Sequence, residues 1–281
     1  MIKRIPSIYN HILIIALPFW ALYSHTFMKL IDDWSNDDNY SHGFLIPFIT
    51  GYMIWQKKDD LKEIVLKPDN LGILVVLAGV MMHIVGNVGA ELFVMRASII
   101  VTLWGLILYL FGRKVGWLII IPIVYLIFMI PLPSIIWNQI AFPLQLFAAK
   151  LSSQVIQMFG MPILREGNIL HLSNTTLEVV DACSGLRSLN SLMALGGAFA
   201  YISLMYRWTQ WALFLSAIPI AIAVNIIRLT ITAFMARYIG PEAAHGFLHD
   251  MSGLLVFAVA FILLYLVYWV LDRFESKAYD S

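Results

Sequence analysis

Eight runs of apolar residues, each close to the length that crosses a lipid bilayer, constrain this chain more than any other feature. A hydrocarbon core about 30 Å thick requires roughly 20 consecutive apolar residues in a helix. The runs lie at 9–30, 43–56, 70–88, 96–112, 115–131, 186–205, 209–236 and 252–271. We therefore expect an all-α polytopic membrane protein with about eight transmembrane helices, built as a single integral-membrane domain over residues 1–281.

The overall composition agrees with a membrane protein. Of the 281 residues, 60% are hydrophobic and 12% are charged, whereas a soluble domain has roughly 45–50% apolar and 25% charged residues. A soluble fold of this size has no interior large enough for so much apolar surface, so membrane lipid is the first partner that we expect. A net charge of +1 with both signs interspersed offers no basic face for nucleic acid.

Basic residues beside the runs predict the orientation. The amino-terminal run has no small-residue cleavage site, so we expect it to be a retained span and not a signal peptide. If the amino terminus is cytoplasmic, 11 of the 18 basic residues fall in inner segments, as the positive-inside rule requires. They are Lys3, Arg4, Lys57, Lys58, Lys62, Lys67, Arg113, Lys114, Arg207, Arg273 and Lys277. Both termini are then cytoplasmic.

The stretch 132–185 is too polar and too rich in proline to form simple spans, and this orientation places it on the outer side. Its first part, from Ser134 to Met158, predicts an extracytoplasmic helix that lies on the membrane or dips into it. Apolar and polar residues then alternate on both sides of 174–176, which predicts a short β-hairpin. Such an insert either shapes a functional site or is a covering flap without chemistry.

The only cysteine, Cys183, follows this hairpin and precedes the run that begins near Leu186. A single cysteine excludes an internal disulfide and a cysteine-based zinc site, so Cys183 is either an inert small residue or a reactive thiol. At a helix amino terminus, free N–H groups and the helix dipole lower the pKa of a thiol. Arg187, four residues later, adds positive charge on the same helical face. We interpret Cys183 as a nucleophile.

Arg228 is a charged residue inside the apolar run 209–236. A charge within a span costs several kcal/mol unless it faces a polar partner or cavity. Asn225 stands three residues earlier, on the same helical face. Arg228 is either a structural residue bonded to neighbouring carbonyls or a cation that binds a carboxylate or stabilises an oxyanion.

Two histidines, His245 and His249, precede the last run on the outer side. A histidine at the outer membrane surface can act as the general base for a thiol and then as the general acid for the leaving amine. The spacing of four also fits a pair of metal ligands on a helix, but no further ligand completes a zinc site, so we expect no metal. Cys183, Arg228 and His249 together are the minimum set for cysteine acyl transfer.

These residues stand in motifs similar to those of a known family. The chain resembles the exosortases, bacterial membrane relatives of the archaeosortases, over nearly its whole length. The segment Asp181-Ala-Cys-Ser-Gly-Leu-Arg187 carries the resemblance most specifically, followed by Asn225-Ile-Ile-Arg228 and His249-Asp-Met-Ser-Gly253. Tyr40-Ser-His42-Gly-Phe44 also resembles the amino-terminal region of that family.

The resemblance implies a catalytic set of Cys183, Arg228 and His249 in a cysteine peptidase or transpeptidase of the bacterial cytoplasmic membrane, without a cofactor. The implied substrates are secreted proteins that end in a sorting signal: a short Pro-Glu-Pro-like (PEP-CTERM) motif, one transmembrane helix and a basic tail. The acceptor is a lipid, a glycan or water. We assign to substrate binding the residues Arg187, Asn225, His42, His245 and Asp181.

Two other functions compete with this hypothesis. A transporter or lipid flippase would use Arg228 and Asn225 to line a polar pathway and would not need Cys183. An intramembrane metalloprotease would use His245 and His249 as metal ligands and would be sensitive to chelators.

Overall fold

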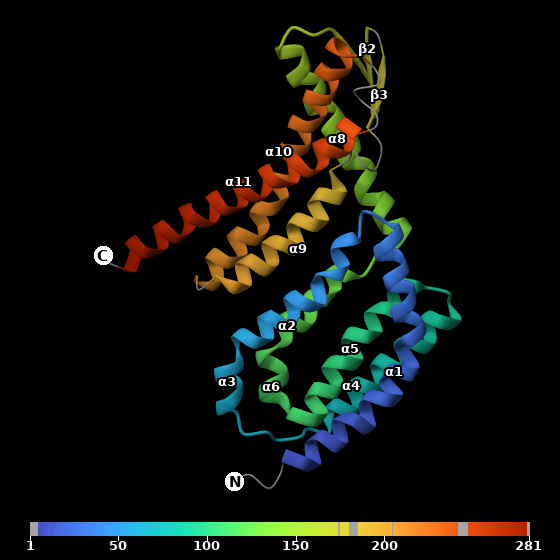
Figure 1. Cartoon of the computed structure of the whole chain (residues 1–281), viewed down its shortest axis with the longest axis vertical. Coiled ribbons are helices and arrows are strands. Elements are labelled where there is room, and N and C mark those ends of the chain that lie inside the picture. The colour runs from blue at the N-terminus through green and yellow to red at the C-terminus, as the bar shows by residue number, and fades with distance from the viewer. Residues whose placement is uncertain (1–4, 174, 180–184, 204, 241–246, 280–281) are drawn as a thin grey trace. The chain divides into compact units, whose positions relative to one another are not determined.

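The computed structural model describes residues 5–173, 175–179, 185–203, 205–240 and 247–279, with the side chains of 5–13, 247–252, 254 and 277–279 excepted. The described chain is mostly helical and contains one small sheet (Figure 1). It divides into two compact units, Met1–Pro133 and Ser134–Ser281.

All the described elements of the first unit are helical. Its long helices are α1, α4 and α5, and shorter pieces connect them. In chain order its elements are α1 (Ile5–Asn36), η1 (Ser41–Phe44), α2 (Ile46–Gln56), α3 (Lys58–Glu63), α4 (Leu71–Val88), α5 (Leu92–Phe111), α6 (Arg113–Leu118), α7 (Ile120–Tyr125) and η2 (Leu126–Met129).

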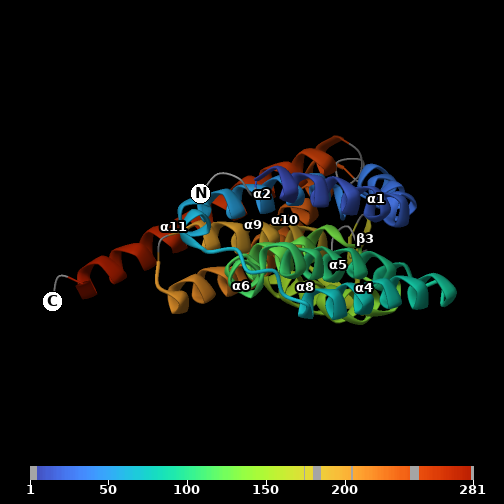
Figure 2. The ribbon, with the colours of Figure 1, turned by 90° about the horizontal axis from the view of Figure 1, so that it is seen from below.

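Helices α4 and α5 form the closest pair in this unit, side by side in both views (Figures 1 and 2). Gly72, Gly79 and Gly86 recur every seventh residue and lie against the backbone of Tyr109, Thr102 and Met95. A Cβ on Gly86 would lie only 2.7 Å from the amide nitrogen of Met95. Small residues at this spacing allow close backbone approach, which stabilises helix pairs in lipid through van der Waals contact.

Polar contacts attach α1 to α5. The Tyr23 hydroxyl lies 2.7 Å from Thr102 Oγ1 and accepts a hydrogen bond from Ser98 Oγ at 3.1 Å. Nearer the end of α1, Asp33 forms an ion pair with Arg96, a side chain that is only 4% exposed. Because buried charges need partners, this pair fixes α1 against the start of α5.

Fewer long helices are present than the eight spans predicted from hydropathy. In the part of the chain that the structure describes, five helices are long and apolar enough to cross a membrane, or six if Ile120–Met129 and Ser134–Met158 count as one broken span. The five are parts of α1, α4, α5, α10 and α11. The chain is therefore a helical multi-pass membrane protein, and the number eight is not confirmed.

The difference has local causes. The run 43–56 forms only α2, whose 11 residues rise about 16 Å, half of the hydrocarbon thickness. The run 115–131 is divided at Ile119, just before a helix whose third residue is Pro122. Since proline has no N–H to donate to the preceding turn, the helix is interrupted there. The run 186–205 forms a helix of 17 residues, at the lower limit for a span.

In the second unit, the described residues form four helices and a three-stranded sheet. Its elements are α8 (Ser134–Met158), β1 (Ile163–Glu166), β2 (Ile169–Leu172), β3 (Thr176–Glu178), α9 (Leu186–Ile202), α10 (Arg207–Tyr238) and α11 (Phe247–Tyr279). The predicted helix from Ser134 to Met158 is present as α8. Strands β2 and β3 pair antiparallel where the alternation predicted a hairpin, and β1 adds a third strand in the order β1-β2-β3.

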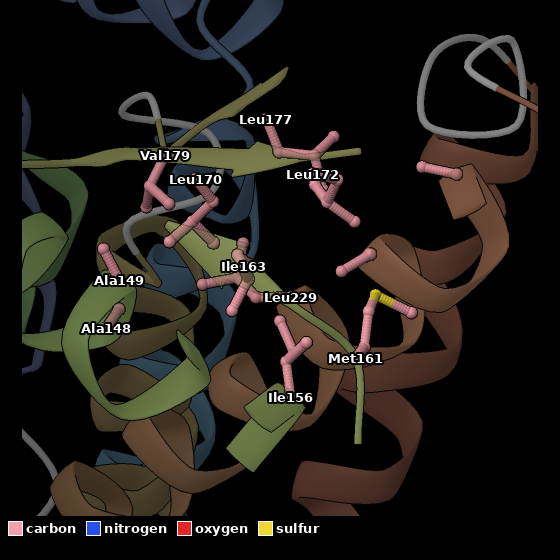
Figure 3. Close-up of a cluster of buried hydrophobic side chains, with 12 residues drawn as sticks. Ala148, Ala149, Ile156, Met161, Ile163, Leu170, Leu172, Leu177, Val179 and Leu229 are labelled. Carbon is pink, nitrogen blue, oxygen red and sulfur yellow. The ribbon is translucent and has the colours of Figure 1, made fainter. Parts of the chain in front are cut away.

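The sheet packs against α8 and α10 through one apolar cluster (Figure 3). Leu170, Leu177 and Val179 point from the sheet toward the side chains of the helices, and Leu170 and Val179 are completely buried. The full cluster is Ala148, Ala149, Ile156, Met161, Ile163, Leu170, Leu172, Leu177, Val179, Leu229, Ala233 and Ala236. The sheet is therefore held against the last turns of α10.

A second cluster joins α9, α10 and α11, which lie side by side in both views (Figures 1 and 2). Around Gly196 of α9, Ala217 of α10 and Leu264 of α11 approach within 4 Å of a built Cβ. The Tyr206 amide, just before α10, donates to Glu275 Oε1 near the end of α11 at 2.7 Å. Helices α10 and α11 are therefore antiparallel.

Candidate functional site

The structure describes the predicted site residues to different degrees. Arg187, Asn225 and Arg228 are described with their side chains, and all three interact with other groups. His249 is the third residue of α11, and only its backbone is described. Cys183, Asp181 and His245 lie outside the described residues.

Gly185, two residues after the cysteine, contacts Asn225 directly. A Cβ built on Gly185 would lie between 2.9 and 3.0 Å from three atoms of the Asn225 side chain. Gly185 also has a φ of +82°, a left-handed conformation that side chains with a Cβ adopt at a cost. Its carbonyl then accepts the first bond of α9 from the Leu189 amide at 2.8 Å. The glycine that ends the sequence Cys-Ser-Gly thus adopts a backbone conformation that favours glycine over other residues.

Asn225 and Arg228 are buried on one side of α10. Asn225 is 2% exposed and Arg228 is 9% exposed, although α10 has a mean hydropathy of 2.1 over its most apolar window. Three residues apart, they are neighbours on the helix surface. The helix therefore holds an amide and a guanidinium together in an apolar setting, where hydrogen bonds from them are stronger than in water.

The strand that precedes the cysteine belongs to the apolar cluster that also contains residues of α10. The Val179 amide donates to the Asn168 carbonyl at 2.9 Å, and Asn168 Nδ2 donates to the Val179 carbonyl at 3.2 Å. Val179 belongs to the buried cluster that contains Leu229, the neighbour of Arg228. Val179 and Gly185, which flank the segment 180–184, thus both belong to parts of the chain that pack with α10.

Arg187 lies in the first turn of α9 and is partly buried. It stands two residues after Gly185, at the helix end where the backbone N–H groups have no intrahelical acceptor. Its positive charge adds to that of the helix dipole at this end. The first turn of α9 therefore favours negatively charged groups.

His42 belongs to the first unit, in η1. It hydrogen-bonds to the backbone of Phe128, and burial lowers the pKa of its imidazole despite that bond. Next to it, burial raises the pKa of Tyr40 to about 12, and the Tyr40 hydroxyl accepts a bond from the Leu132 amide at 3.0 Å. Within its unit, His42 is thus a neutral side chain that joins η1 to η2.

Other features of the described residues involve none of the predicted site residues. A cavity of about 420 Å³ in the first unit is lined by Val65, Lys67, Asp69, Phe111, Gly112, Arg113 and Lys114, none of which was predicted as a site residue. Hydropathy did not predict the burial of Arg96, because this residue stands at the border of the predicted span 96–112, where a charged residue is typical of a loop. Among the described side chains, no group of three His, Cys, Asp or Glu residues could hold a metal ion.

Comparison with known proteins supplies one match. A family model described as transmembrane exosortase matches residues 34–266. The matched range includes all the predicted site residues, from His42 to His249. No curated protein and no solved structure matches the chain.

Proposed function

Because the chain belongs to the transmembrane exosortase family, we propose that it is a membrane-embedded cysteine peptidase or transpeptidase that processes carboxy-terminal sorting signals of secreted proteins. Its substrates would carry a Pro-Glu-Pro-like motif before a single transmembrane helix and a basic tail. Since such a tail remains on the cytoplasmic side of the inner membrane, the scissile region would face the periplasm. The excess of basic residues in the predicted inner segments supports an active site on that outer side.

The proposed reaction is acyl transfer through a thioester. The Cys183 thiolate attacks the scissile carbonyl, and the oxyanion that forms is stabilised by the Arg228 guanidinium. His249, having taken the thiol proton, donates it to the leaving amine, so that the peptide C–N bond breaks and a thioacyl enzyme remains. An acceptor hydroxyl or amine, or water, then attacks the thioester and loses its proton to His249, and the thiol is restored.

One observation carries the proposal: the contact between Gly185 and Asn225. Gly185 is two positions after Cys183, and covalent geometry limits the distance between their Cα atoms to about 7 Å in any conformation. Asn225 is one helical turn from Arg228. This limit supports a position of the cysteine near the α10 turn that holds the buried arginine.

The position of His249 is supported by the register of α10 and α11. Extending the antiparallel alignment of Tyr206 with Glu275 and of Ala217 with Leu264 puts Gly253 level with Arg228. Position 249 is then one turn farther along, a rise of about 6 Å. It also shares a helix face with the buried Val256, seven residues later, which packs in the α9–α11 cluster.

The test is processing of a tagged secreted protein with such a carboxy-terminal signal, co-expressed with the wild type, Cys183→Ala or Ser184→Ala. We expect the wild type and the Ser184→Ala control to shorten the product and Cys183→Ala to leave it intact at equal expression. Equal processing by wild type and Cys183→Ala would refute the cysteine mechanism and favour the transporter or flippase. Mass spectrometry of the new carboxyl end would identify the acceptor.

A second arm of the same assay tests the arginine. We expect Arg228→Lys to slow processing by roughly 100-fold or more, as the loss of one oxyanion donor does in other acyl-transfer enzymes. The matched control is Arg237→Lys, since Arg237 is exposed near the end of the same helix. Full activity in Arg228→Lys would remove Arg228 from the proposed mechanism.

A further inference from the structure

The sheet of the second unit has two edges, β1 and β3, and hydrogen-bond alternation shows which main-chain groups each edge presents. In an antiparallel pair, every second residue exchanges both main-chain bonds with its partner. The Leu172 amide donates to Thr175 and the Val179 amide donates to Asn168. These pairs fix the phase, so Leu177 bonds to Leu170 across the same ladder. Thr176 and Glu178 therefore direct their N–H and C=O groups away from β2.

The two edges differ in what covers them. On β1, Ile163 directs its carbonyl outward, and this oxygen accepts a bond from Gln157 Nε2 of α8 at 3.1 Å. On β3, Thr176 and Glu178 are both exposed, and their outward main-chain groups have no hydrogen-bond partner among the described residues. The β3 edge thus offers two donors and two acceptors in extended geometry, the arrangement to which a further strand adds.

The position of β3 in the chain indicates what adds to it. Glu178 precedes Cys183 by five residues, and Asn168 fixes the end of β3 through Val179. Leu177 faces the buried cluster that also contains Leu229 of α10. The residue after β3, Val179, leads directly into the segment that carries the proposed nucleophile, and an extended peptide is the ligand class that pairs with an open strand edge.

We propose that the polypeptide substrate binds as an extra β-strand on the edge of β3, with its main chain paired to Thr176 and Glu178, and that this pairing delivers the scissile bond to Cys183. This inference rests on the proposed peptidase function. It assigns to the sheet a specific role: main-chain bonds supply affinity at any sequence, while alternate substrate side chains face the protein.

Proline substitution tests the pairing without disturbing the sheet. Thr176→Pro removes an outward N–H that β2 does not use, a change that edge strands tolerate. Arg165→Pro makes the same change on the β1 edge, because Arg165 also directs its N–H outward, opposite Leu170. We expect Thr176→Pro to lower kcat/KM for a signal peptide by roughly tenfold, as for the loss of one main-chain bond to the substrate, and Arg165→Pro to change it less than twofold.

Binding to a Cys183→Ala protein separates this inference from the proposed function. A fluorescent signal peptide should bind Cys183→Ala and bind more weakly when Thr176→Pro is added. If Thr176→Pro processes and binds as well as the wild type while Cys183→Ala is inactive, strand addition is refuted and the peptidase stands. If Cys183→Ala processes normally, the peptidase itself fails.

A second measurement needs no variant of the protein and covers the case in which Thr176→Pro does not fold. Signal peptides methylated at one backbone nitrogen at a time are presented to the wild-type protein. Strand addition predicts that methylation weakens binding at every second residue of the paired segment, because only those N–H groups face β3. Equal binding of all methylated peptides would refute the proposal.

Discussion

At the scale of single residues, two arginines of this protein lie where apolar surroundings make a charge costly. Arg96 and Arg228 are both nearly buried in helices that are apolar enough to span a membrane. Arg96 pairs with Asp33, and such a pair explains its burial by structure alone. Arg228 lies one helical turn from Asn225, which contacts the turn at Gly185, and we propose a chemical use for its charge in acyl transfer.

His42 carries a residue-scale prediction about stability and pH. Burial lowers the pKa of His42 in the folded protein, so the unfolded chain, with a pKa near 6.5, binds the proton more readily. Stability is complete above that pH and is lost as the pH falls from about 6.5 toward the folded pKa. We expect the unfolding temperature in detergent to fall over this range, and to fall less in His42→Gln, which stays neutral.

The control for this prediction is His25→Gln, since His25 is exposed on α1. It should keep the pH dependence of the wild type. An identical decline in the wild type and His42→Gln would show that another group causes the acid sensitivity.

At the scale of elements, close helix contact depends on glycine. The seven-residue spacing of Gly72, Gly79 and Gly86 places all three against α5, where helix backbones touch. In the second unit, the absence of a side chain at Gly185 likewise allows its backbone to contact the side chain of Asn225. In both places a missing side chain determines which segments meet.

Gly79→Ala tests the contact of α4 with α5. The new Cβ would lie 2.8 Å from the Thr102 amide nitrogen, so one helix must shift. We expect a loss of about 1–3 kcal/mol in the free energy of unfolding, the usual cost of overpacking, measured by denaturation in detergent. Gly51→Ala is the matched control, because a Cβ there meets nothing within 4 Å. It should be neutral or stabilising, since alanine favours helix.

At the scale of the whole molecule, the chain is a multi-pass member of the transmembrane exosortase family that divides into two compact units, and its orientation is a prediction from charge. Inner segments are expected to carry 11 of the 18 basic residues, which places the end of α1 outside and α3 inside. The segment of the proposed nucleophile would then open to the compartment that secreted substrates reach.

Cysteine labelling tests this orientation directly. Because the chain has one cysteine, Cys183→Ser alone gives a background free of thiols. Into it we would place Asn36→Cys or Lys62→Cys, both at exposed positions. A membrane-impermeant maleimide applied to spheroplasts should label position 36 at once and position 62 only after lysis. Labelling of position 62 in intact spheroplasts would contradict the predicted topology.

Much of the fold and of the candidate site could be predicted because it depends on neighbours along the chain. The length of an apolar run determines whether a helix can span lipid, so α1, α4, α5, α10 and α11 were predictable, as was the helix from Ser134 to Met158. The residues at 181–187, 225–228 and 249–253 indicated the family for the same reason, since their motifs are local.

The tertiary structure alone determined what depends on residues distant in sequence. The contact of Gly185 with Asn225 joins positions 40 residues apart, and the pairing of Asp33 with Arg96 joins two helices; no local pattern encodes either. Strand β1 escaped prediction because only its first residue is buried, so it does not alternate. Hydropathy also measures only the length of an apolar run, so it did not indicate that the helix in the run 115–131 is interrupted near Pro122. Such contacts form only when separate elements pack into one core. This packing brings Val179 and Gly185, which flank the segment of Cys183, to α10.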